Sequence, residues 1–525
     1  MKDKPNREAR TFFKRLTAAA FSLFLLTSIF AIVGSLSSNS IIPAANAEES
    51  AETQVITSES LETGQVVAAS GSNRFVVWQD DTPGNSDIFF KRSNDNGATW
   101  KSSVNLSKNP GDSEDARLIV QDSYVYVVWV QANSAGDQQD VYFRRSTDNG
   151  ATWGPKVNVS TNGNSGQSAL AVSGANVYIA FASSDDDLLF RQSSDHGSSF
   201  GSVTTLSPGE FNGRLTMAVS GSYVYVGWEG NGDSPVVRRS FDNGVTWDSE
   251  VGLPGAYGYG TDSFVLAAIG PYVYGVWQEA IGCGGDEEIQ FSRSTDNAAS
   301  WEEEEVIGGC EGSPSVGFNA MAVSGSKIFI AYSSAGEIFI KHSTDNGEDW
   351  SASVNLSDNP GSSIFGGIAV HSSKVYVIWT QINAGGNLAD IFLRRSTDSG
   401  ATWKAVKNVS DNDGWSEHPQ IAVSGSNVYI TWDDTTYGDS EILFKRSTNS
   451  GGTLKPVVQI SDNDGASTEP RMMTIGSSIF IVWTDDSSGN ADVLHRRSTS
   501  SGSTWKTTLN LSDNEGSSQY PQIAG

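Results

Sequence analysis

Two groups of aromatic and acidic residues in this 525-residue chain have the chemistry of a ligand site. The first group comprises Trp415, Glu417 and His418, with Tyr437 a short distance later. An aromatic face can stack on a sugar ring while carboxylates accept hydrogen bonds from its hydroxyl groups. The group therefore predicts a binding site, with ordinary loop packing as the alternative.

The second group lies near the only two cysteines of the chain, Cys283 and Cys310. It combines the same residue types, and its members are Tyr257, Tyr259, Asp262 and Glu279. We regard these four residues as further candidates for ligand binding.

Pairs of acidic residues suggest a cation site. Asp80 and Asp81 form one pair, and Asp433 and Asp434 form another. Hard cations such as Ca²⁺ prefer clustered carboxylate and carbonyl oxygens. The twelve-residue calcium loop with its closing glutamate is absent, so the sequence identifies no cofactor and leaves Ca²⁺ as the cation that these residues would suit.

These residues must be positioned by a repeat that runs through most of the chain. An octapeptide of the form Ser-x-Asp-x-Gly-x-Thr-Trp recurs nine times, with a mean step of about 51 residues. The copies occupy residues 93–100, 146–153, 193–200, 240–247, 294–301, 343–350, 396–403, 447–454 and 498–505. Its acid is Asp95, Asp148, Asp195, Asp242, Asp296, Asp345 or Asp398 in the first seven copies.

The octapeptide has the composition of a tight turn. Aspartate accepts hydrogen bonds from nearby backbone amides, glycine adopts a positive φ, and the final tryptophan provides an apolar body for packing. An arginine recurs directly before the octapeptide, as in Arg145 and Arg497, and predicts pairing between repeats rather than catalysis.

Each repeat contains four short β-rich runs bounded by glycine, serine, asparagine or aspartate. Four strands per repeat are typical of a propeller blade. We predict an all-β propeller of about nine blades over residues 48–525, in one ring, with two smaller rings as the alternative. Residues 54–58 resemble a spare fourth strand and residues 520–525 a spare first strand, so one of them should close the ring.

The octapeptide resembles the Asp-box, or bacterial neuraminidase, repeat of sialidases, sortilin-type receptors and other secreted β-propellers. The resemblance covers nearly all of residues 48–525 and implies the fold. Sialidases in this family use an arginine triad, and the candidates here are Arg117, Arg214 and Arg471. The family's Phe/Tyr-Arg-Ile-Pro motif is missing, which puts the sialidase activity in doubt.

Loop topology favours recognition on the face opposite the octapeptides, where the loops between second and third strands lie. We predict a non-catalytic scaffold that binds glycans or a protein partner. A sialidase-like glycoside hydrolase and a structural surface role are the alternatives.

The N-terminus predicts export from the cytoplasm. Residues 1–47 have a basic head, an apolar run and an Ala-Asn-Ala sequence, which fit a signal peptide or an uncleaved membrane anchor. The net charge is −27, and loss of this segment, which carries six basic and two acidic residues, leaves −31. This charge argues against a nucleic-acid partner and suits a secreted or surface-anchored protein, with membrane contact only through residues 1–47.

The two cysteines are expected to form a disulfide. Cys283 and Cys310 lie 27 residues apart, in loops predicted on the same face of one blade. Closing this loop should stabilise the folded protein by about 3 kcal/mol. Thiol labelling of the denatured, unreduced secreted protein should find no free thiol, and two reactive thiols would contradict the pairing.

Overall fold

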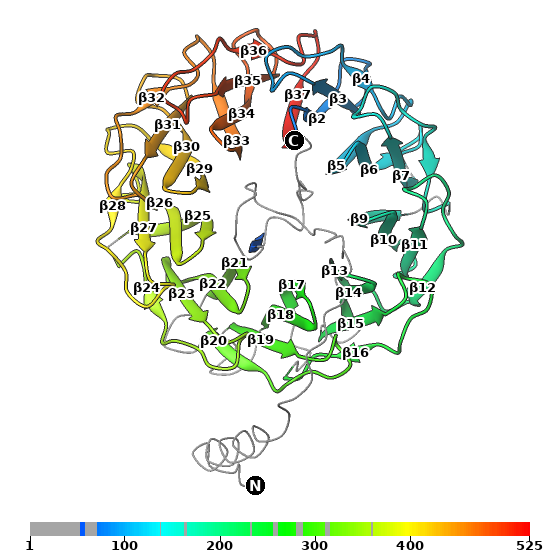
Figure 1. Cartoon of the computed structure of the whole chain (residues 1–525). Coiled ribbons are helices and arrows are strands. Elements are labelled where there is room, and N and C mark those ends of the chain that lie inside the picture. Colours follow the sequence, from blue (N-terminus) through cyan, green and yellow to red (C-terminus); the bar gives the residue numbers. More distant parts are fainter. Residues whose placement is uncertain are drawn as a thin grey trace, which may run out of the picture. The chain divides into compact units, whose positions relative to one another are not determined.

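The computed structural model describes residues 53–57, 71–136, 138–161, 165–230, 234–255, 261–279, 287–309, 316–358 and 361–524. The chain divides into the units Met1–Asn39 and Ser40–Gly525, and every described element belongs to the second. These elements are all β-strands, which form nine sheets around one axis (Figure 1). This unit is a nine-bladed β-propeller in a single ring, as predicted.

The predicted N-terminal signal or anchor, residues 1–47, lies outside the described residues. Within the described ranges, no helix has the length and apolarity needed to span a membrane.

Each blade is built on four antiparallel strands, counted here from the axis outward, and blade 6 has a fifth strand inside these four. The innermost strands of blades 1 to 9 are β37 (Ser518–Ala524), β5 (Ser113–Gln121), β9 (Ser165–Ser173), β13 (Gly213–Ser220), β17 (Thr261–Ile269), β21 (Val316–Ser324), β25 (Ser362–His371), β29 (Ser416–Ser424) and β33 (Ser467–Ile475). The second strands are β2 (Arg74–Asp80), β6 (Tyr124–Ala132), β10 (Asn176–Ser183), β14 (Tyr223–Gly230), β18 (Tyr272–Glu279), β22 (Lys327–Ser334), β26 (Lys374–Ile382), β30 (Asn427–Asp434) and β34 (Ser478–Asp485).

The two outer strands flank the octapeptide turns, and the outermost strands are short. The third strands are β3 (Asp87–Ser93), β7 (Gln139–Ser146), β11 (Leu188–Ser193), β15 (Ser234–Ser240), β19 (Glu288–Ser294), β23 (Glu337–Ser343), β27 (Ala389–Ser396), β31 (Glu441–Ser447) and β35 (Asp492–Ser498). The outermost strands are β4 (Val104–Asn105), β8 (Val157–Asn158), β12 (Thr204–Ser207), β16 (Val251–Gly252), β20 (Glu305–Gly309), β24 (Val354–Asn355), β28 (Lys407–Asn408), β32 (Val458–Gln459) and β36 (Leu509–Asn510).

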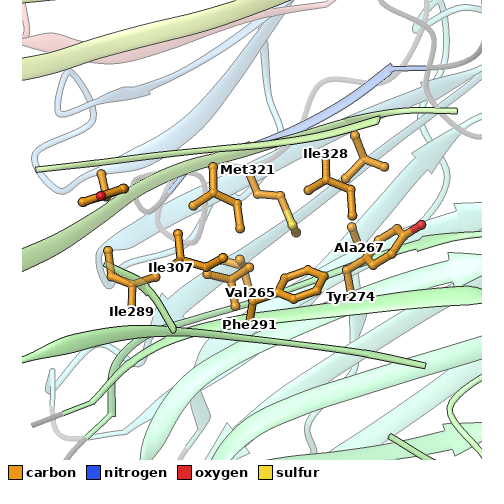
Figure 2. Close-up of a cluster of buried hydrophobic side chains, with 12 residues drawn as sticks. Val265, Ala267, Tyr274, Ile289, Phe291, Ile307, Met321 and Ile328 are labelled. Carbon is orange, nitrogen blue, oxygen red and sulfur yellow. The ribbon is translucent and has the colours of Figure 1, made fainter. Parts of the chain in front are cut away.

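The hydrophobic core lies between neighbouring blades. Figure 2 shows the cluster between blades 5 and 6, where Val265 and Phe291 of one blade pack against Met321 and Ile328 of the next. A comparable cluster joins each pair of neighbours, and the cluster around Phe480 and Trp78 joins blade 9 to blade 1. Because a sheet with two apolar faces needs a neighbour on each side, these contacts require a closed ring.

The octapeptides form the turns that the sequence predicts. In residues 146–153, Asp148 Oδ1 accepts hydrogen bonds from the Ser146 hydroxyl at 2.8 Å and from the Thr152 amide at 2.8 Å. Gly150 has a φ of 73°, and a Cβ there would lie 2.5 Å from Phe90 of the preceding blade. Trp153 packs edge-on against the same Phe90, with ring centroids 4.8 Å apart.

The arginine before the octapeptide joins one blade to the next. Arg145 donates a hydrogen bond to the His196 carbonyl at 2.9 Å, in the octapeptide of the following blade. Arg497 of blade 9 makes the same bond to the Asn96 carbonyl of blade 1 at 2.8 Å. The predicted pairing between repeats is confirmed, and it continues across the junction of the first and last blades.

Closure uses the C-terminal strand. β37 pairs antiparallel with β2 and provides the innermost strand of blade 1. The other candidate, β1 (Thr53–Thr57), pairs instead with β21 on the inner side of blade 6, as a fifth strand. The chain end, rather than residues 54–58, therefore closes the ring.

A repeated Asn-x-Ser sequence in the outermost strands has a structural role. Asn408 donates a hydrogen bond to Asp390 Oδ2 at 2.9 Å, and Ser410 donates one to Asp390 Oδ1 at 2.6 Å. Equivalent pairs bind Asp87, Asp140 and Asp492. Each pair ties an outermost strand to the start of the third strand.

The octapeptide aspartates should make the stability of the folded protein depend on pH. The hydroxyl and amide of Thr402 and the hydroxyl of Ser396 lower the pKa of Asp398 to about 2. The stabilisation is therefore complete above the unfolded pKa of about 4 and is lost as pH falls toward 2. Asp398→Asn should lower the urea midpoint at pH 7, and its difference from wild type should vanish near pH 2.

Asn449 occupies the same place in blade 8 and accepts hydrogen bonds from the Ser447 hydroxyl and the Thr453 backbone amide, so asparagine fits the turn. Its side-chain amide donates to the Thr453 hydroxyl, which reverses the bond between Thr402 and Asp398. A difference between the two proteins that stays constant from pH 7 to pH 2 would contradict the assigned role of the Asp398 charge.

Candidate functional site

The innermost strands of several blades contain a bulge close to where they begin. The pairing register shifts between Glu114 and Arg117 in β5, between Glu417 and Gln420 in β29, and between Thr468 and Arg471 in β33. A bulge adds an unpaired residue and re-aims its side chain.

Five non-glycine residues at this bulge position have a left-handed backbone. Their φ values lie between 48° and 54°, and the residues are Asp115, Arg214, His418, Glu469 and Tyr520. This conformation is costly for residues other than glycine and is found most often at functional sites.

Four of these five residues line one cavity of about 440 Å³. Tyr520, Asp115, His418 and Glu469 come from blades 1, 2, 8 and 9, which are consecutive in the closed ring. Arg471, Gln522 and the Val77–Gln79 segment of β2 complete most of the wall. The cavity thus lies beside the strands that close the ring.

The cavity combines an exposed aromatic ring with polar groups. Tyr520 is 60% exposed. Arg471 is half-buried and has no hydrogen-bond or ion-pair partner among the described residues. Gln522 donates a hydrogen bond to the Ala116 carbonyl at 2.9 Å, which holds blades 1 and 2 together at the wall.

The buried carboxylate of Asp433 is hydrogen-bonded to two of the bulge residues, His418 and Glu469. Asp433 Oδ2 lies 2.8 Å from His418 Nδ1 and accepts a hydrogen bond from the Glu469 amide at 3.0 Å. Hydrogen bonding to Asp433 raises the pKa of His418 against the opposing effect of burial. Asp433 therefore links blades 8 and 9 and places a readily protonated imidazole at the cavity.

The first predicted group is only partly brought to this cavity. His418 lines it, whereas Trp415, Glu417 and Tyr437 do not. The Trp415 amide donates to the Thr435 hydroxyl at 2.8 Å, and the Thr435 amide donates to the Trp415 carbonyl at 3.1 Å, so two loops are tied together. Tyr437 is 55% exposed on the adjacent loop.

The second predicted group falls largely outside the described residues. Tyr257, Tyr259, Cys283 and Cys310 lie there, as does the side chain of Asp262. Glu279 is fully buried and accepts a hydrogen bond from the Trp277 indole at 3.3 Å. Burial and this hydrogen bond give Glu279 a structural role in the blade core.

The three candidate arginines are not gathered in the cavity. Arg117 and Arg471 occupy the same register, opposite Val128 and Val482 in their second strands, and only Arg471 lines the wall. Arg214 occupies the bulge position of blade 4 instead. The cavity therefore contains one arginine of the proposed triad.

The paired acids serve as hydrogen-bond acceptors. Asp434 accepts bonds from the Trp432 indole, the Ser416 hydroxyl, the Asn412 amide group and the Thr436 backbone, at 2.7–2.9 Å. Asp80 has the same set of donors in blade 1. Asp81 accepts a bond from the Ser517 amide.

No group of three possible metal ligands was found in the part of the chain that the structure describes. A Ca²⁺ site at these acids therefore stays a prediction.

Sequence reasoning missed Asp115, Glu469 and Tyr520. Asp115 lies in residues 113–116, where alanine replaces the proline of the repeat. A signal for the other two exists in the repeated Ser-x-x-Pro sequence at 416–419, 467–470 and 518–521, whose third residues are His418, Glu469 and Tyr520. Aligning the repeats on this sequence would have placed all three at one position.

The imidazole of His418 should titrate above its ordinary pKa because of its hydrogen bond to Asp433. Because the pKa of His418 is raised, its contribution to stability is complete below pH 6.5 and is lost as pH rises through the folded-state value. NMR titration of the imidazole should give a pKa above 6.5 in wild type and a lower value in Asp433→Asn. An equal pKa in the two proteins would show that the pair is not coupled.

No protein-family model matches the chain, and no curated protein matches it. One solved structure, from a study of two prolyl endopeptidases, aligns at 10% identity and a TM-score of 0.40 over 74% of this chain and 54% of that chain. The BP39L lectin from Burkholderia pseudomallei aligns at 12% identity and a TM-score of 0.38, over 78% and 99%. A polysaccharide lyase described as an ulvan lyase aligns at 11% identity and 0.36, over 77% and 93%. Such likenesses carry no information on ligand or activity.

Proposed function

We propose that this protein is a secreted or surface-anchored Asp-box propeller that recognises a glycan without cleaving it. The glycan would bind in the cavity formed by blades 8, 9, 1 and 2. One observation carries this proposal: four bulge residues with strained backbones, from four consecutive blades, line one cavity. Location outside the cytoplasm rests on the sequence of residues 1–47.

The composition of the cavity suits a sugar. Tyr520 offers an exposed ring for stacking on the apolar face of a pyranose. Carboxylates of Asp115 and Glu469 can accept hydrogen bonds from hydroxyl groups, and Arg471 can donate to ring and hydroxyl oxygens. Sites for small ligands commonly combine a few polar groups with an apolar wall in this way.

The inner side of the ring differs between its two halves. At one register position of the innermost strands, blades 8, 9, 1 and 2 carry Gln420, Arg471, Gln522 and Arg117. At the same position, blades 5, 6 and 7 carry Val265, Ala320 and Gly367. Long polar side chains are thus concentrated on the half that contains the cavity.

The test is a glycan array followed by titration of the best binder. Tyr520→Ala should weaken binding by about tenfold or more, which corresponds to about 1.4 kcal/mol. Phe241→Ala is the matched control, because Phe241 is 51% exposed and belongs to an octapeptide turn. If Tyr437→Ala loses glycan binding and Tyr520→Ala does not, the binding site lies at the loop beside Trp415 and not in the cavity.

The alternative function is a sialidase-like hydrolase. Hydrolysis needs paired catalytic groups at a defined separation, and the family's activity needs an arginine triad. With one candidate arginine in the cavity, we expect no turnover of a fluorogenic sialoside. If the wild-type protein hydrolyses the sialoside and Arg471→Ala does not, the proposed function of glycan recognition is wrong and the protein is a hydrolase.

A further inference from the structure

The charges around the cavity are unequal. Arg471 is a permanent cation, and protonated His418 is balanced by its partner Asp433 at 2.8 Å. Glu469 and Asp115 add two carboxylates to the wall. Asp433 does not line the cavity but is buried directly behind His418, and with it three acids outnumber two cations even when His418 is protonated.

The geometry points to an amino sugar as the ligand: we propose that the cavity prefers a pyranose with a free ammonium group to its neutral N-acetyl form, and disfavours acidic sugars. This inference rests on the proposed function, since it assumes that the cavity binds a glycan. It assigns the ligand class from the charged residues that line the cavity together with Asp433 behind His418.

An ammonium group would be held by attraction from several sides. Glu469 and Asp115 are on blades 9 and 2, with Tyr520 of blade 1 between them in the order of the ring. The two carboxylates accept N–H donors, and the tyrosine ring can lie against the cation. Arg471 is left to donate to neutral hydroxyl or ring oxygens.

An acidic sugar would be repelled by most of the charged groups at the cavity. Its carboxylate could pair with Arg471, but Glu469 and Asp115 face the same cavity and would repel it. The net charge of the whole chain, −27, acts in the same direction at longer range.

The experiment compares three ligands at pH 5.5 by calorimetry with the full secreted protein. The glucosamine trimer and the N-acetylglucosamine trimer differ in charge but share the same backbone, and sialyllactose provides an acidic sugar. The glucosamine trimer should bind about tenfold more tightly than its N-acetyl form, and sialyllactose should bind most weakly.

Single charge removals test which acids are responsible. Glu469→Gln and Asp115→Asn should each reduce the ratio of glucosamine-trimer affinity to N-acetyl-trimer affinity severalfold. Glu210→Gln is the matched control, since it removes one exposed carboxylate from the loop between β12 and β13 of another part of the ring. Circular dichroism at pH 5.5 would verify that each variant is folded.

Several outcomes would overturn the charge assignment. Equal or tighter binding of the N-acetyl trimer would do so, as would tight binding of sialyllactose that is lost in Arg471→Gln. An unchanged preference in both acid variants would also contradict it. If none of the three ligands binds and Tyr520→Ala leaves the glycan array unchanged, the proposed function itself fails.

Discussion

The rest of the structure depends on the contacts between each octapeptide turn and the blade before it. At six of the nine junctions between described residues, an arginine of the preceding blade donates to a carbonyl of the octapeptide, as Arg145 does to His196. At another junction the terminal Trp153 packs edge-on against Phe90. One of the nine apolar interfaces joins the last blade to the first, and there Arg497 donates to the Asn96 carbonyl. Blades 1 and 9 cannot bury both of their faces until that junction forms, so closure of the ring completes the core.

Closure also decides where a site can form. Because β37 is the innermost strand of blade 1, Tyr520 near the C-terminus comes to lie beside Asp115 near the start of the ring. Glu469 and His418 approach from the other side, both held by Asp433. A rigid scaffold of repeated turns thus supports a cavity that uses the few positions at which the repeats differ.

Much of the fold could be predicted because its determinants are local. Alternating apolar residues, the turn chemistry around Asp148 and the repeated arginines predict strands, turns and blade contacts without knowledge of the ring. The cavity could not be predicted in the same way. It depends on bulges that shift register within a strand, and on which blades become neighbours through β37. His418 was identified through its neighbour Trp415, whereas Tyr520 was assigned only to a closing strand.

The distribution of backbone strain argues that the cavity is more than a product of the repeat. If blade geometry required a left-handed residue at the bulge, every blade would contain one. Among the described residues, non-glycine examples occur at this position in five blades, and four of the five line the cavity, with Arg214 as the exception. Each costs about 1–3 kcal/mol. Left-handed residues also occur in every octapeptide turn, but those at the bulge are concentrated on the side of the ring that contains the cavity, which favours a role for their side chains there.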